Sequence, residues 1–183
     1  MKKIALIFKL IISPRDAWKQ IFRGGIESRI FEQDVFYPLL GIASCSSFVQ
    51  MFYDSNYTLM LAIIEAIILF VSYFIGYIAA SFGIGMFLPL LQEAGFRSSE
   101  SRIRLLVMSN MSILVIIDII QNLLPTQMAL CDLFPIYLLF VISKSVQYFH
   151  LKADKSVYFM LVAFGCIVFL QWVIELLLEK IIL

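Results

Sequence analysis

Charged residues are scarce in this chain, because they make up only 15% of its 183 residues, against about a quarter in soluble globular domains. Hydrophobic residues reach 62%, and the mean hydropathy is +0.95. Since a spanning helix takes about 20 apolar residues, the chain has room for four or five spans and little else. This composition excludes a separate soluble catalytic domain and any nucleic-acid-binding domain.

Residues for metal, thiol and acid–base chemistry are equally few. Three scattered cysteines cannot build a disulfide framework, and a single histidine, His150, cannot complete a structural zinc site. The sequence also has no nucleophile elbow and no phosphate-binding glycine loop. We therefore expect no enzyme activity, no cofactor and no metal.

What the sequence does contain is a series of long apolar runs. They predict an all-α polytopic membrane protein with five spans, at 35–53, 57–80, 103–124, 133–149 and 157–178. Residues 1–34 form a separate N-terminal segment, and residues 35–183 form the five-helix bundle.

The second apolar run is too long for one crossing of the membrane. It continues to Leu91, and as one helix it would extend about 52 Å, against a hydrocarbon core of about 30 Å. The run could protrude into the cytoplasm as one helix, or it could break near Gly83, Gly85 and Pro89, which disfavour a regular helix. We favour the break. Residues 81–91 would then form a bent interfacial stretch.

The basic residues predict the orientation. Thirteen of the 14 Lys and Arg residues lie before the first span, in the loop after the second, or around the end of the fourth, and only Lys180 lies on the other side. By the positive-inside rule, we expect a cytoplasmic N-terminus and a C-terminus on the far side of the membrane.

The N-terminal segment predicts a pair of amphipathic helices at the membrane interface. Residues 1–12 have a basic face and an apolar face, although the same stretch could also be a frayed tail packed on the bundle. Ser13 suits the N-cap of a second helix and Pro14 its first position, and the Gly24-Gly25 pair suits its end. Trp18 fits the level of the lipid headgroups.

The order of these features resembles the Yip family, the Ypt/Rab-interacting five-span membrane proteins. The resemblance is carried by the Pro-initiated helix from Ser13 to Phe22, the small residues that end the second span from Gly76 to Gly85, and the polar loop with Arg102-Ile103-Arg104. The third span has Met-Ser-Asn-Met-Ser at 108–112 in place of the family's Tyr-Ser and Pro signature. The short N-terminal segment resembles that of bacterial relatives, which implies a location in a bacterial inner membrane.

The resemblance implies a five-helix bundle and a non-enzymatic scaffold that organises lipid or unidentified membrane protein partners. Candidate cytoplasmic docking residues are Trp18, Arg97, Arg102 and Arg104, which could bind anionic lipid headgroups or an acidic partner. The arginines could equally do no more than anchor the topology.

Two acidic residues within the spans favour another function. Glu65 and Asp118 interrupt apolar runs, and intramembrane acids are costly enough to be functional candidates. They would suit a small transporter or channel for a cation or proton, or they could simply be hydrogen-bonded within the bundle. We expect Glu175, near the end of its span, to be solvated.

Small residues recur at helical spacing in the second span. Ser72, Gly76 and Ala80 are four residues apart, which lets helix backbones approach closely. This spacing indicates helix packing, either within the chain or between copies in a homo-oligomer.

Overall fold

The computed structural model describes residues 4–54, 56–93, 95–96, 98–124, 129–152 and 154–182, with the backbone alone at residues 4 and 129–133. Over these residues all named elements are helical and the only β feature is one isolated bridge, between Gln92 and Leu151. The prediction of an all-α fold is therefore confirmed for this part of the chain.

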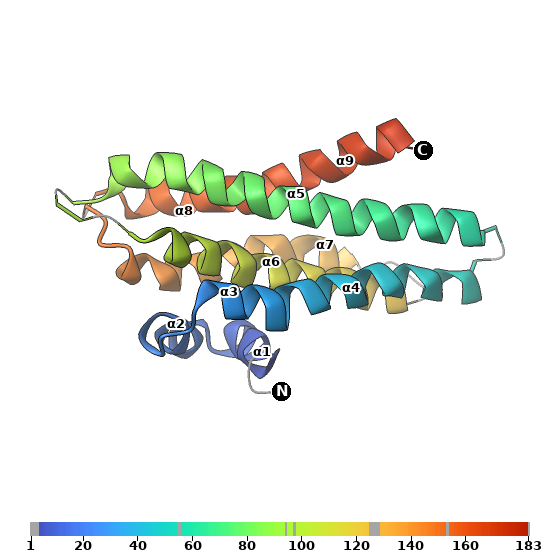
Figure 1. Ribbon diagram of the computed structural model, residues 1–183, viewed down its shortest axis with the longest axis horizontal. Coiled ribbons are helices and arrows are strands. Elements are labelled where there is room, and N and C mark those ends of the chain that lie inside the picture. The colour runs from blue at the N-terminus through green and yellow to red at the C-terminus, as the bar shows by residue number, and fades with distance from the viewer. Residues whose placement is uncertain are drawn as a thin grey trace.

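Four helical segments in the described residues are long and apolar enough to cross a membrane: Ser28–Phe52, Leu59–Leu91, Glu100–Leu123 and Ser156–Ile182. They run along the long axis of the molecule (Figure 1) and overlap the first, second, third and fifth predicted spans. The fourth prediction, 133–149, overlaps helix α7 (Ala129–Ser145) and the 3-10 turn η3 (Val146–Tyr148). That α7 also spans the membrane stays a prediction.

The first and last of these segments are built from several helical types. The first comprises α3 (Ser28–Phe31), the π-helical turn η1 (Glu32–Phe36), α4 (Tyr37–Ser46) and the 3-10 turn η2 (Ser47–Phe52). The last comprises α8 (Ser156–Phe164), the π-helical turn η4 (Gly165–Phe169) and α9 (Leu170–Ile182). Because the first helix begins at Ser28, it starts before the predicted residue 35.

The predicted break in the second span is wrong. Helix α5 (Leu59–Leu91) is continuous, although Pro89 lies inside its last turn, where its missing N–H removes one backbone hydrogen bond near the end of the helix. Gly83 serves packing instead of bending, because a Cβ there would lie 2.9 Å from the Sγ of Cys166. Gly85 likewise faces Ile103 of the neighbouring helix.

Helix α6 (Glu100–Leu123) is the central helix of the bundle. Every residue from Leu105 to Val115 is buried, as expected for a helix with neighbours on all sides. We call the end of the bundle where α5 begins and α6 ends the outer end, following the predicted orientation, and the opposite end the inner end. Asp118 thus lies on α6 towards the outer end, and Arg104 on α6 at the inner end.

Two short helices, α1 (Ile4–Ile12) and α2 (Pro14–Arg23), lie together on one flank of the bundle (Figure 1). Ser13 and Gly24 occupy the predicted cap positions and Pro14 the first turn, so the predicted bounds of the second helix are confirmed. Leu10 and Trp18 are fully buried, so the apolar faces of this pair pack on the bundle. Their location at a membrane interface stays a prediction.

Candidate functional site

The two predicted intramembrane acids line one cavity near the outer end of the bundle. This acidic cavity has a volume of about 350 Å³. Its carboxyl groups come from three different spanning helices: Glu65 from α5, Asp118 from α6, and Glu175 and Glu179 from α9. No Lys or Arg is among its described lining residues, so we expect its interior to carry a negative potential.

Tyrosines hold the two predicted acids in place. The hydroxyl of Tyr73, on α5, donates a hydrogen bond of 2.6 Å to Oδ2 of Asp118, which ties α5 to the central helix. Tyr57 donates to Oε2 of Glu65.

Amide and hydroxyl groups form the rim of the acidic cavity. Nε2 of Gln50 donates to Oδ1 of Asn122 at 2.8 Å, and Nδ2 of Asn122 donates to Oγ of Ser46 at 2.9 Å. Because these bonds join the first spanning helix to α6, the rim is fixed by packing between separate helices. The cavity is therefore a product of the tertiary fold.

A buried polar pair continues from the region of Tyr73 into the bundle. Nε2 of Gln171, on α9, donates to Oγ of Ser72 at 3.1 Å, and Ser72 is the neighbour of Tyr73 in the chain. Gln171 is only 4% exposed, and its Oε1 has no hydrogen-bond partner among the described residues. On α6, Oδ1 of the buried Asn110 is also without a partner among the described residues. Buried unpaired acceptors of this kind are typical sites for ordered water or an ion.

The sequence reasoning missed the contribution of α9. Glu175, expected to be solvated, lines the acidic cavity, and neither Gln171 nor Glu179 was singled out. A signal was present, because Gln171, Glu175 and Glu179 are four residues apart and thus share one face of a helix. Among the described residues, no three His, Cys, Asp or Glu side chains converge closely enough to hold a metal ion.

The predicted docking residues have partners within the chain. Trp18 is fully buried, so the prediction that it contacts a cytoplasmic partner does not hold in this structure. Arg102 donates to the carbonyl of Tyr148 at 3.2 Å. Arg104 pairs with Glu100 one turn earlier on α6, at 2.5 Å. Arg97 lies outside the described residues.

The small residues of α5 are covered within a single chain. Ser72, Gly76 and Ala80 are all buried. A Cβ at Gly76 would lie 2.2 Å from Oε1 of Gln171 and 3.4 Å from the Cε of Met111, so the backbone of α5 approaches α9 and α6 closely there. This face is therefore used for packing inside the bundle.

No protein-family model, curated protein or solved structure matches the chain. The resemblance to the Yip family thus stays a prediction. Over the described residues, the fold defines the class as a helical protein with four helices long and apolar enough to cross a membrane.

Proposed function

We propose that this protein is a small non-enzymatic membrane protein that takes up a proton or a monovalent cation in its acidic cavity, as the first step of transport. The observation that carries the proposal is the convergence of carboxyl groups from α5, α6 and α9 on one cavity. Acids within spanning helices normally face a water-filled cavity or one another, and they mark ion and proton pathways. The unpaired acceptors of Gln171 and Asn110 supply polar groups deeper in the bundle.

We further infer the membrane arrangement on which this function depends. With α7 as a fifth span, the N-terminus is cytoplasmic and the acidic cavity opens on the far side of a bacterial inner membrane. The distribution of Lys and Arg supports this orientation. The cavity would then collect cations from outside the cell.

The structure supports transport better than a scaffold built on the predicted docking residues. Trp18 is buried and Arg102 donates to the carbonyl of Tyr148, so two of the predicted docking residues are engaged within the chain. The acidic cavity, in contrast, unites Glu65 and Asp118 as the transport hypothesis expects. If the protein carries out no transport, the result would favour the other hypothesis, a Yip-type scaffold.

Flux measurements on reconstituted protein test the proposal. Liposomes containing a trapped pH-sensitive dye, or loaded with Na⁺ or K⁺, should show protein-dependent flux under an imposed gradient. We expect Asp118→Asn to lower this flux about tenfold or more, because a hydrogen bond to a charged group contributes about 1.5–3 kcal/mol. Glu65→Gln should lower it as well.

A matched control is Glu93→Gln, which neutralises an exposed carboxyl group at the inner end of the bundle and should leave flux unchanged. Equal flux in liposomes with and without the wild-type protein would refute the proposal. So would undiminished flux in the double variant Glu65→Gln/Asp118→Asn.

A further inference from the structure

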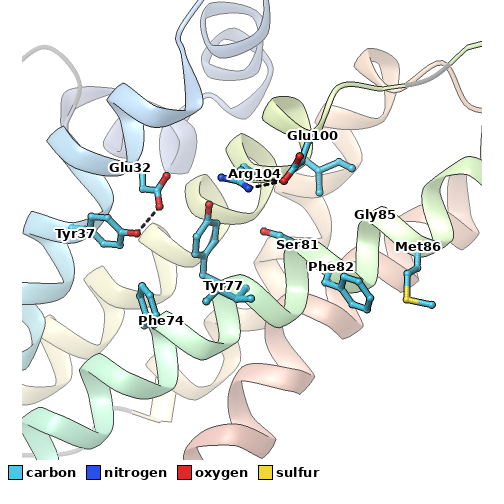
Figure 2. A pocket seen from close by; sticks show the side chains of 12 residues that line it. Glu32, Tyr37, Phe74, Tyr77, Ser81, Phe82, Gly85, Met86, Glu100 and Arg104 are labelled. Carbon is cyan, nitrogen blue, oxygen red and sulfur yellow. Dashed lines mark hydrogen bonds and ion pairs between the residues drawn. The ribbon is translucent and has the colours of Figure 1, made fainter.

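A second cavity, of about 640 Å³, lies at the inner end of the bundle between the first spanning helix, α5 and α6. We call it the Arg104 pocket. Figure 2 shows that its polar side chains gather on one side: Glu32, Tyr37, Tyr77, Glu100 and Arg104. It is separate from the acidic cavity, with which it shares no lining residue.

The opposite wall of the Arg104 pocket is apolar and faces outward from the bundle. It is a stripe of Phe74, Ile78, Phe82 and Met86, each one turn after the previous one on α5. These side chains are 38–69% exposed although α5 is a membrane-spanning helix, so the bilayer is the medium that covers them. The pocket therefore combines a lipid-facing wall with a polar side.

The depth of the polar side matches that of lipid headgroups. Tyr77 and Ser81 follow Leu59, the first residue of α5, by 18 and 22 positions, which is about 27 and 33 Å along a helix. A hydrocarbon core of about 30 Å that begins near the start of α5 would end between them. Polar groups at this level meet the phosphate and glycerol region of the inner leaflet.

The charges of the Arg104 pocket favour a headgroup with charges of both signs. One guanidinium and two carboxyl groups line it, so a purely anionic headgroup would meet more negative than positive charge. Nη2 of Arg104 lies 2.5 Å from Glu100, and a guanidinium has further donors that suit a phosphate. Glu32 accepts one hydrogen bond, of 2.5 Å, from Tyr37, and a carboxylate has capacity for an ammonium as well.

One unsatisfied atom also points to a ligand. Oγ of Ser81 lines the pocket, is buried, and has no hydrogen-bond partner among the described residues. A buried hydroxyl without a partner is costly, and a phosphate or ester oxygen of a lipid would accept its hydrogen bond.

We propose that the Arg104 pocket binds one inner-leaflet phospholipid whose headgroup carries both a phosphate and a primary amine. The phosphate lies on Arg104 and Ser81, the ammonium lies on Glu32, and an acyl chain runs from this level towards the outer end along Ile78 and Phe74. Because this site does not involve the acidic cavity, it stands independently of the transport proposal.

Native mass spectrometry of the delipidated protein tests this site with three lipids of identical acyl chains. Phosphatidylethanolamine has the primary amine, phosphatidylcholine has it fully methylated, and phosphatidylglycerol lacks it. We expect wild-type protein to retain one phosphatidylethanolamine about tenfold more tightly than either of the others, a ratio that one charge-assisted hydrogen bond supplies. Equal retention of the three lipids would show ordinary annular lipid and overturn the proposal.

Three variants separate the parts of the site. Arg104→Gln should weaken all three lipids about tenfold, whereas Glu32→Gln should remove only the preference for the primary amine. Gly85→Leu should fill the pocket without changing its charge, since a Cβ at Gly85 meets only the Cδ1 of Ile103, at 3.9 Å.

The matched control is Arg15→Gln, which removes an exposed arginine on α2 and should leave lipid retention unchanged. Thermal unfolding of each variant verifies that it is folded. If folded Arg104→Gln and Gly85→Leu variants both retain phosphatidylethanolamine as the wild type does, the lipid does not occupy this pocket and the proposal fails.

Discussion

Replacing Trp18 by alanine is expected to lower the free energy of unfolding by about 3–5 kcal/mol, the range observed when a large buried aromatic side chain is removed. Trp18 is fully buried. Its ring stacks on Phe22 with centroids 5.3 Å apart, and its Nε1 donates a hydrogen bond of 2.8 Å to the carbonyl of Val141 on α7. The substitution would therefore leave a cavity and break the attachment of α2 to α7.

Two further variants make this prediction specific. Trp18→Phe keeps an aromatic ring but loses the indole donor. We expect it to lower the free energy of unfolding by less than Trp18→Ala does, and about 1 kcal/mol of that loss comes from the hydrogen bond. Trp172→Ala is the matched control, because Trp172 is 58% exposed on α9. Chemical unfolding in detergent gives the free energies, and limited proteolysis near Gly24 reports whether α1 and α2 detach. Equal stability of Trp18→Ala and Trp172→Ala would contradict the packing described above.

The same helix pair shows which features local sequence signals can predict. Ser13, Pro14 and Gly24 act through the backbone of their own turn, and the bounds of α2 follow them. The burial of Trp18 depends instead on Val141, which is 123 positions away in the chain. The amphipathic sequence pattern is the same whether the indole lies at the membrane interface or is buried against α7, so the pattern alone does not distinguish the two locations.

Helix α5 shows how tertiary packing overrides a local signal. Gly83 and Gly85 weaken an isolated helix, and on that basis a break was expected. In the bundle Gly83 allows close approach to Cys166, so packing stabilises the helix at the point where its own propensity is weakest. Only the distance to Cys166, which no local pattern contains, distinguishes the two roles.

The acidic cavity was predictable in part. Glu65 and Asp118 stand out because each interrupts an apolar run, but their position in one cavity depends on how α5 and α6 pack. The four-residue spacing of Gln171 and Glu175 is visible in the sequence, and it gains meaning only once that face of α9 is known to point inward. The Arg104 pocket could not be predicted from the sequence for the same reason, because its walls come from three separate segments of the chain.

The second large effect is expected at Gly76, where α5 and α9 pack most closely. A Cβ there would lie 2.2 Å from Oε1 of Gln171, so Gly76→Ala forces that side chain to move away from Ser72. The displaced amide is buried, and an unsatisfied buried polar group costs about 1–3 kcal/mol. Since alanine itself favours the helix by about 1 kcal/mol, we expect the net loss in the free energy of unfolding to be about 2 kcal/mol at most. Gly76→Leu should separate the helices and be more severe.

A double-mutant cycle isolates the cause. Gln171→Ala removes the side chain that Gly76→Ala displaces, so the double variant should be more stable than the sum of the two single effects predicts. Gly41→Ala is the matched control, because a Cβ at Gly41 meets no atom within 4 Å and alanine favours the helix by about 1 kcal/mol. Strictly additive effects at Gly76 and Gln171 would show that the two residues are not in contact.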